Sequence, residues 1–196
     1  MTEKTPCMAP LIAEHEVDYG PLAALAGAWY GESGTDVAPE PDGKEINPFY
    51  ETIVFTPAGD TTNAEEQTLV AMHYHQVVRR KSDHKVFHNE TGFWLWEPAT
   101  GRVTQTLTIP RGVSVIAEGR AEANGEGWVL EVETTEDGRV GAIAQTPFLA
   151  QKARTLSFTH RIEVAGDTLR YTETTLVDIY GRRFEHTDRN TLQRTA

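Results

Sequence analysis

From Phe49 to the C-terminus, apolar and polar residues alternate in short runs that are separated by Pro, Gly, Asn or charged clusters. A period of two places every second side chain on the same face, which is typical of a β-strand with one buried face. The pattern predicts strands at residues 49–55, 67–78, 86–96, 102–109, 112–119, 128–135, 152–164, 167–177 and 182–194.

The segment that precedes these strands is less regular. Residues 21–26 begin with proline and are followed by Gly27, which predicts a short helix. Residues 37–48 contain two internal prolines and a glycine and are expected to form a loop. The cluster Pro-Ala-Gly-Asp at 57–60 is expected to form a turn.

Many consecutive strands with short connections imply an up-and-down meander, and closing it removes the two exposed edges of an open sheet. The sequence therefore predicts an all-β chain: a single closed antiparallel up-and-down β-barrel of about ten strands with a short N-terminal helix. Lipocalins and fatty-acid-binding proteins have this architecture. A barrel of that size has room inside for a ligand. We expect a flexible tail at residues 1–18 and the barrel domain at 19–196.

The first strand is expected to begin in the run Gly27-Ala28-Trp29-Tyr30-Gly31. Glycine permits a sharp bend and a close approach between backbones. The indole of Trp29 brings a large apolar area from one position, so it is a candidate to fill one end of the barrel.

Composition excludes several classes of partner. The chain has 196 residues, a hydrophobic fraction of 39% and a net charge of −11, which argues against binding to nucleic acid or to an anionic membrane surface. Cys7 is the only cysteine, so neither an internal disulfide nor a cysteine-based metal site is expected. No leader-like segment or apolar run of about 20 residues occurs, and we expect a cytoplasmic protein.

Histidines are the first candidates for chemistry. His73 and His75 share one strand face, as in a cupin-type metal site, but the glutamate that such a site needs is absent, so a half-exposed face is favoured. His84 lies in a charged turn and is expected to be solvated. His160 is followed by Arg161 and is expected to have a surface cross-strand role.

His88 and Glu90 also share a strand face. An imidazole next to a carboxylate can form a general acid–base couple, or it can be a hydrogen-bonded structural link inside a polar barrel end. No hydrolase elbow, phosphate-binding loop or dinucleotide fingerprint accompanies the pair. The residues alone therefore predict a ligand-binding barrel without identifying the ligand.

The run Leu-x-Gly-x-Trp-x-Gly-Glu-x-Gly at 25–34 resembles the G-x-W-x-G-x-G signature of the nitrobindin family. Further similar segments follow in the same order, at residues 48–55, 74–76, 88–94, 110–113, 166–171 and 191–194. The resemblance covers nearly the whole chain from Pro21 onward.

Nitrobindins are fatty-acid-binding-protein-like barrels that hold haem b in a cleft at one end, with a histidine of the last strand as the iron ligand. The resemblance implies that His186 ligates the iron and that Trp29, Gly31, Thr35 and Lys152 line the cleft. It also implies that the haem binds nitric oxide and isomerises peroxynitrite to nitrate, in which case the protein is an isomerase.

His186 lies one residue further from Thr191 than the family pattern has it. Since side chains alternate across a strand, we expect a bulge near residues 188–190 to turn the imidazole inward. The alternative is a haem-free, non-enzymatic barrel that binds a small apolar ligand such as a fatty acid. A homodimer is left open.

Overall fold

The computed structural model describes residues 17–195. Of the tail predicted at 1–18, only two residues are therefore described, and Cys7 lies outside the described residues. Within residues 17–195 no helix is long and apolar enough to cross a bilayer.

The predicted short helix is confirmed as the 3-10 helix η1 (Gly20–Leu25). The one α-helix of the described part, α1 (Pro147–Lys152), was not predicted. The strands are β1 (Gly27–Glu40), β2 (Gly43–Asn63), β3 (Gln67–Arg80), β4 (Val86–Glu97), β5 (Arg102–Ile109), β6 (Val113–Asn124), β7 (Gly127–Thr134), β8 (Ala142–Gln145), β9 (Ala153–Ala165), β10 (Thr168–Ile179) and β11 (Arg182–Thr195).

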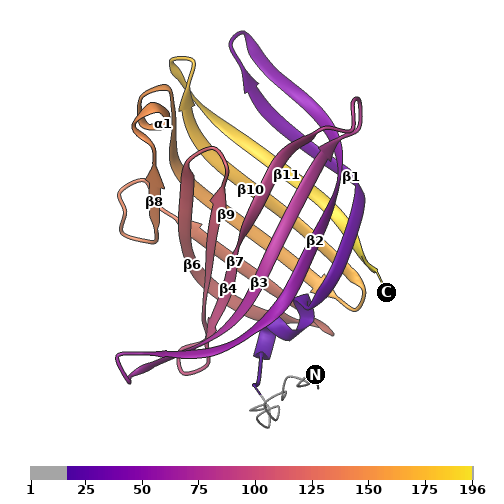
Figure 1. Ribbon diagram of the computed structural model, residues 1–196, viewed down its shortest axis with the longest axis vertical. Coiled ribbons are helices and arrows are strands. Elements are labelled where there is room, and N and C mark those ends of the chain that lie inside the picture. Colours follow the sequence, from indigo (N-terminus) through magenta and orange to yellow (C-terminus); the bar gives the residue numbers. More distant parts are fainter. Residues whose placement is uncertain (1–16, 196) are drawn as a thin grey trace, which may run out of the picture.

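All the strand pairs are antiparallel and form one sheet in the order β5-β4-β3-β2-β1-β11-β10-β9-β7-β6-β8. The additional pairing of β5 with β6 joins this row into a ring that contains every strand except β8 (Figure 1). The predicted closed up-and-down barrel of about ten strands is confirmed.

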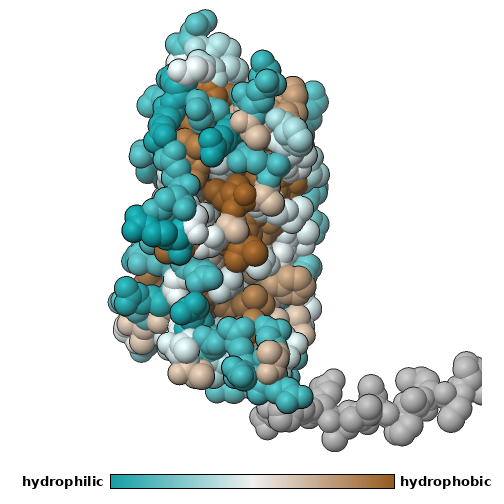
Figure 2. All heavy atoms as spheres, turned by 90° about the vertical axis from the view of Figure 1, so that its left-hand side faces the viewer, coloured by the Kyte–Doolittle hydropathy of each residue, from teal (hydrophilic) through white to brown (hydrophobic). Residues whose placement is uncertain are grey.

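The short strand β8 and the helix α1 interrupt the meander between β7 and β9. β8 pairs with the first residues of β6, and the side-chain amide of Gln145 exchanges two hydrogen bonds with the backbone of Thr155 on β9. Figure 2 views this side of the barrel and shows apolar side chains in its middle with polar ones around them. Ile116 of β6 and Phe148 of α1 are among the exposed large apolar residues.

One end of the barrel is closed by η1. Leu22, Leu25 and Trp29 are fully buried there. The indole nitrogen of Trp29 donates a hydrogen bond of 2.7 Å to the Leu25 carbonyl, and the Arg194 guanidinium lies 4.1 Å from the centre of the indole ring. The expectation that this indole fills a barrel end is confirmed.

The prediction of a loop at residues 37–48 is wrong. β1 and β2 continue through this segment as a hairpin whose turn holds only residues 41–42. The prolines do not prevent this, because β1 pairs with β11 only as far as Val37 and Pro39 therefore lies on an unpaired edge. The turn expected at 57–60 is also wrong: β2 runs through it with a register shift between Pro57 and Asp60.

β1 contains a bulge, because its register against β2 shifts between Gly31 and Gly34 and its register against β11 shifts in the same region. A side chain at Gly34 would overlap the ring of Phe49, and one at Gly31 would approach the Thr191 carbonyl. The two glycines thus allow the first strand to bend where it crosses its neighbours.

Candidate functional site

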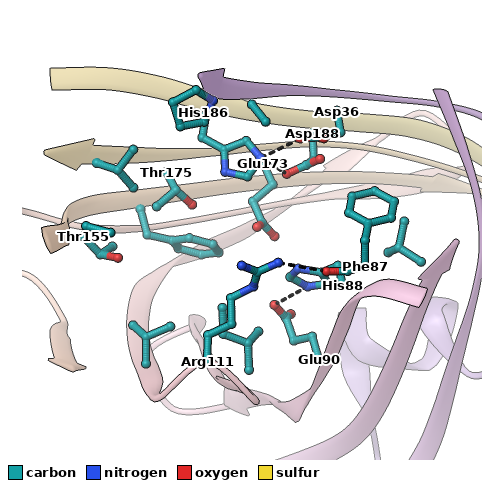
Figure 3. Close-up of a pocket in the computed structure, with 18 of the residues that line it drawn as sticks. Asp36, Phe87, His88, Glu90, Arg111, Thr155, Glu173, Thr175, His186 and Asp188 are labelled. Carbon is teal, nitrogen blue, oxygen red and sulfur yellow. Dashed lines mark hydrogen bonds and ion pairs between the residues drawn. The ribbon is translucent and has the colours of Figure 1, made fainter. Parts of the chain in front are cut away.

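The end of the barrel opposite η1 holds a cleft of about 370 Å³, which is within the size range of small-molecule sites. Its wall is largely apolar and comes from strands around the ring and from α1. The apolar lining residues include Phe49, Val78, Phe87, Leu107, Ile109, Val113, Val115, Leu149, Phe158, Val177 and Ile179. Several titratable side chains interrupt this wall (Figure 3).

The first polar group joins β1 to β11. The His186 Nε2 atom lies 2.6 Å from Asp36 Oδ1 and 3.5 Å from Asp188 Oδ2. The other oxygen of Asp36 accepts a hydrogen bond of 2.9 Å from the Asn47 amide. Asp36 is buried, whereas a third of the His186 side chain remains exposed. Among residues 17–195, these three side chains form the one group whose donor atoms are close enough to hold a metal ion together.

Burial alone would raise the pKa of Asp36, but the hydrogen bonds from His186 and Asn47 hold that pKa below its ordinary value. Burial would likewise lower the pKa of His186, but Asp36 and Asp188 raise it above its ordinary value. The pKa of Asp188 is raised to about 6, chiefly by burial. The contacts between His186 and the two carboxylates thus favour the protonated imidazole and the ionised form of Asp36.

The second polar group lies on β4. The His88 Nε2 atom is 3.3 Å from Glu90 Oε2, and the hydroxyl of Tyr74 donates to the other oxygen of this buried carboxylate. Burial opposes ionisation of both, yet their mutual contact raises the pKa of His88 and lowers that of Glu90. Nearby, the Arg111 guanidinium donates a hydrogen bond of 3.1 Å to the Phe87 carbonyl. The side chains of His88 and Glu90 form an ion pair that lines the cleft.

A third group lies beneath the cleft, around the fully buried Glu51 of β2. Its carboxylate accepts hydrogen bonds from the Gln76 amide (2.6 Å), the Tyr171 hydroxyl (2.9 Å) and the Asn190 amide (2.8 Å). Burial raises its pKa to about 7 despite these three donors. Glu51 thus links β2 to β3, β10 and β11 across the interior.

The surface role expected for His160 is wrong. The side chain is buried, because residue 160 lies on the same inward face of β9 as Phe158 and Ile162. Its Nδ1 atom lies 2.9 Å from the Gln105 side-chain oxygen, and the amide nitrogen of Gln105 donates to the Tyr74 hydroxyl. Because the Gln105 nitrogen donates to Tyr74, the Gln105 oxygen faces His160 and accepts a hydrogen bond from it, which assigns the His160 proton to Nδ1. The Nε2 atom of His160 has no partner among the described residues.

His73 and His75 lie on the outer face of β3. Each ring contacts a side chain of the neighbouring strand at 3.0 Å, Thr91 for His73 and Asn89 for His75. The two imidazoles thus have surface cross-strand partners, as the half-exposed interpretation expected. His84 is exposed in the turn after β3, where it contacts the hydroxyl of Tyr50.

Of the residues predicted to line the cleft, His186 lies in its wall. Trp29 belongs to the closed end, Gly31 to the bulge of β1, and Lys152 is exposed at the end of α1. These three and Thr35 are not among the residues that line this cleft. Asp36 and Ala153, which follow Thr35 and Lys152 in the sequence, do line the cleft.

His186 faces the cleft without the expected bulge near residues 188–190, so that expectation is wrong. β11 pairs with β10 in unbroken register along its whole length, and the extra residue lies in β1 instead. Steps of two from the buried Leu192 lead through Asn190 and Asp188 to His186, which puts all four on the inner face.

Sequence reasoning missed Asp36, Arg111, Glu173 and Asp188, which all line the cleft. The same alternation that predicted the strands would have placed Glu173 and Asp188 on the inner faces of β10 and β11. No signal in the sequence indicated that Asp36, from the segment expected to be a loop, would meet His186.

Two comparisons bear on identity. The family model described as "THAP4-like, heme-binding beta-barrel domain" matches residues 18–194. The crystal structure of Rv2717c from M. tuberculosis is similar to this chain with a TM-score of 0.69 and 24% sequence identity, over 89% of this chain and 95% of that one. The second likeness concerns the fold alone, whereas the first covers nearly the whole barrel and agrees with the resemblance to nitrobindins. The chain belongs to the family of THAP4-like haem-binding β-barrel domains.

Proposed function

We propose that the cleft binds haem b and that His186 would hold its iron. The observation that carries the proposal is the imidazole of the last strand, which lies in the wall of a largely apolar cleft in a chain of a haem-binding family. A histidine of this kind is a common way for a protein to hold haem iron.

The side chains that line the cleft are compatible with a bound haem. The apolar side chains offer contact area for a porphyrin, and Arg80 and Arg111 line the cleft as cations for its propionates. The Nε atom of Arg80 is buried without a partner in the described part of the chain. Ligation by His186 requires its Nε2 to leave Asp36 and to lose its proton.

When bound, the haem supplies an iron centre that binds nitric oxide and supports the isomerisation of peroxynitrite to nitrate. The protein's own residues prepare that centre. Asp36 is the nearest acceptor for the proton that His186 Nε2 must give up, and the Asn47 amide holds the Asp36 carboxylate in place.

A second candidate is a haem-free barrel that binds a small apolar ligand without catalysis. The contact of 2.6 Å between His186 and Asp36 favours it, because an imidazolium in an ion pair is not a metal ligand. The apolar wall is available to either ligand. A cytoplasmic location, a homodimer and the lack of a nucleic-acid partner stay predictions.

Titration of the purified protein with hemin, followed by its visible spectrum, tests the proposal. We expect a saturable Soret band at one equivalent, a shift of that band on addition of nitric oxide, and loss of both in His186→Ala with an unchanged far-ultraviolet circular dichroism spectrum. His75→Ala removes an imidazole from the outer face and should keep the band. Absence of a stoichiometric Soret band in the wild-type protein would overturn the haem assignment in favour of the second candidate.

A further inference from the structure

Glu173 on β10 lies deep in the cleft, and Figure 3 shows its carboxyl group pointing into the open space. Its side chain is 13% exposed, and no side chain or backbone group of residues 17–195 donates a hydrogen bond to it. The nearest nitrogen of a histidine, lysine or arginine in the described chain is His160 Nδ1 at 3.6 Å, which is too far for a hydrogen bond and already faces Gln105.

The most deeply buried carboxylates of the interior differ in this respect. Asp36, Glu51 and Glu90 each accept hydrogen bonds from side chains of neighbouring strands. The carboxyl group of Glu173 instead opens onto the cleft and receives no donor from the described chain, so an entering ligand can supply one. Glu173 therefore has its hydrogen-bonding capacity directed at whatever enters the cleft.

The charges around Glu173 are mostly of the same sign. Burial raises its pKa well above the ordinary value, and the carboxylates of Glu90, Asp188 and Glu51 add to that effect. Each of the two cleft histidines is already paired with a carboxylate of its own, and the Arg111 guanidinium donates to a backbone carbonyl. The inner end of the cleft thus has more carboxyl groups than cations to balance them.

We propose that Glu173, with Glu90 and Asp188 beside it, forms a subsite for the protonated amine of an otherwise apolar ligand. An ammonium group has three donors and a positive charge, so it supplies both what the Glu173 carboxyl lacks and what the surrounding carboxylates attract. The apolar wall above it covers the rest of the ligand. A fatty-acid carboxylate is disfavoured at this end, because it adds another negative charge. The proposal goes beyond haem binding and does not depend on it.

The test uses the full chain without added hemin and three ligands of equal chain length: dodecylamine, dodecanol and dodecanoate. Each is titrated calorimetrically at pH 7, below its micelle concentration. We expect the amine to bind about tenfold more tightly than the alcohol, the typical effect of one charge-assisted hydrogen bond, and the carboxylate to bind most weakly. A carboxylate that binds as tightly as the amine, or an amine that does not bind, would overturn the proposal.

The variant Glu173→Gln keeps the shape of the side chain and removes its ability to become negatively charged when an ammonium group binds. It should bring the affinity for dodecylamine down to that for dodecanol, while dodecanol binding itself stays unchanged and reports an intact cleft. Glu185→Gln, an exposed position on β11, makes the same change of charge and should keep the amine preference. If Glu173→Gln also keeps that preference, Glu173 is not the amine partner and the subsite is wrong. Hemin takes no part in these titrations, so their outcome is independent of the haem proposal.

Discussion

Single polar residues inside this barrel are held by partners that lie far away along the chain. His160 contacts Gln105, and Gln105 contacts Tyr74, so one amide fixes the tautomer of the imidazole and also satisfies a buried hydroxyl. Since burial removes the imidazole from water, the pKa of His160 is lowered to about 4. The neutral ring is therefore part of the folded structure.

The pKa of His160 predicts how stability depends on pH. Between pH 4 and the ordinary histidine pKa of 6.5, the unfolded chain binds a proton that the folded chain does not bind, so stability falls as the pH falls through this window. The full difference is roughly 3 kcal/mol. In urea unfolding at pH 7 and pH 4.5, His160→Gln should lose less stability than the wild-type protein on acidification. An equal loss in both proteins would show that His160 is protonated in the folded state.

At the scale of elements, the bulge of β1 decides how the cleft is built. The bulge lets β1 bend between its pairing with the closed end and its pairing at the cleft, where it carries Asp36. Gly34 leaves room for the ring of Phe49, which lies in the cleft wall. One glycine thus shapes a strand and a binding surface together.

The variant Gly34→Ala tests this role. The added methyl group overlaps the Phe49 ring, so we expect a loss of about 1–3 kcal/mol, as for other overpacked sites. Gly43→Ala is the matched control, because a methyl group there meets nothing within 4 Å, and it should change stability by less than about 1 kcal/mol. Equal midpoints of chemical unfolding for the two variants would mean that Phe49 moves aside without cost.

At the scale of the whole molecule, the closed ring gives every strand in it two neighbours, whereas β8 and α1 lie outside the ring. β8 pairs with β6, and no residue of α1 is buried. Local opening is easiest where few buried contacts hold a segment. Residues 142–152, which form β8 and α1 and include Leu149 of the cleft wall, should therefore be the least stable part of the cleft.

Hydrogen exchange followed by mass spectrometry checks this expectation. Peptides that cover residues 142–152 should exchange well before peptides from β5 and β6, whose pairing closes the ring. If β5 and β6 exchange as early as residues 142–152, the ring opens at that pairing in solution.

The sequence by itself determined the type of fold. Alternation with a period of two predicted most of the strands, and for β5 it gave both ends correctly. The glycines around Trp29 indicated a bent first strand with a large side chain at a barrel end. These features are local, because the pleat of a strand and the freedom of glycine depend on a few neighbouring residues.

Only the tertiary structure decided which of the inward-facing polar residues meet. Asp36 and His186 are separated by most of the chain, and they come together because β1 pairs with β11. His160 follows the alternation of Phe158 and Ile162 to the inner face, but its contact with Gln105 depends on strands that are distant in the sequence. Alternation separates the two faces of a strand but does not say which one encloses the cleft when both carry polar residues. That choice is made by pairing between distant strands, which the local pattern does not contain.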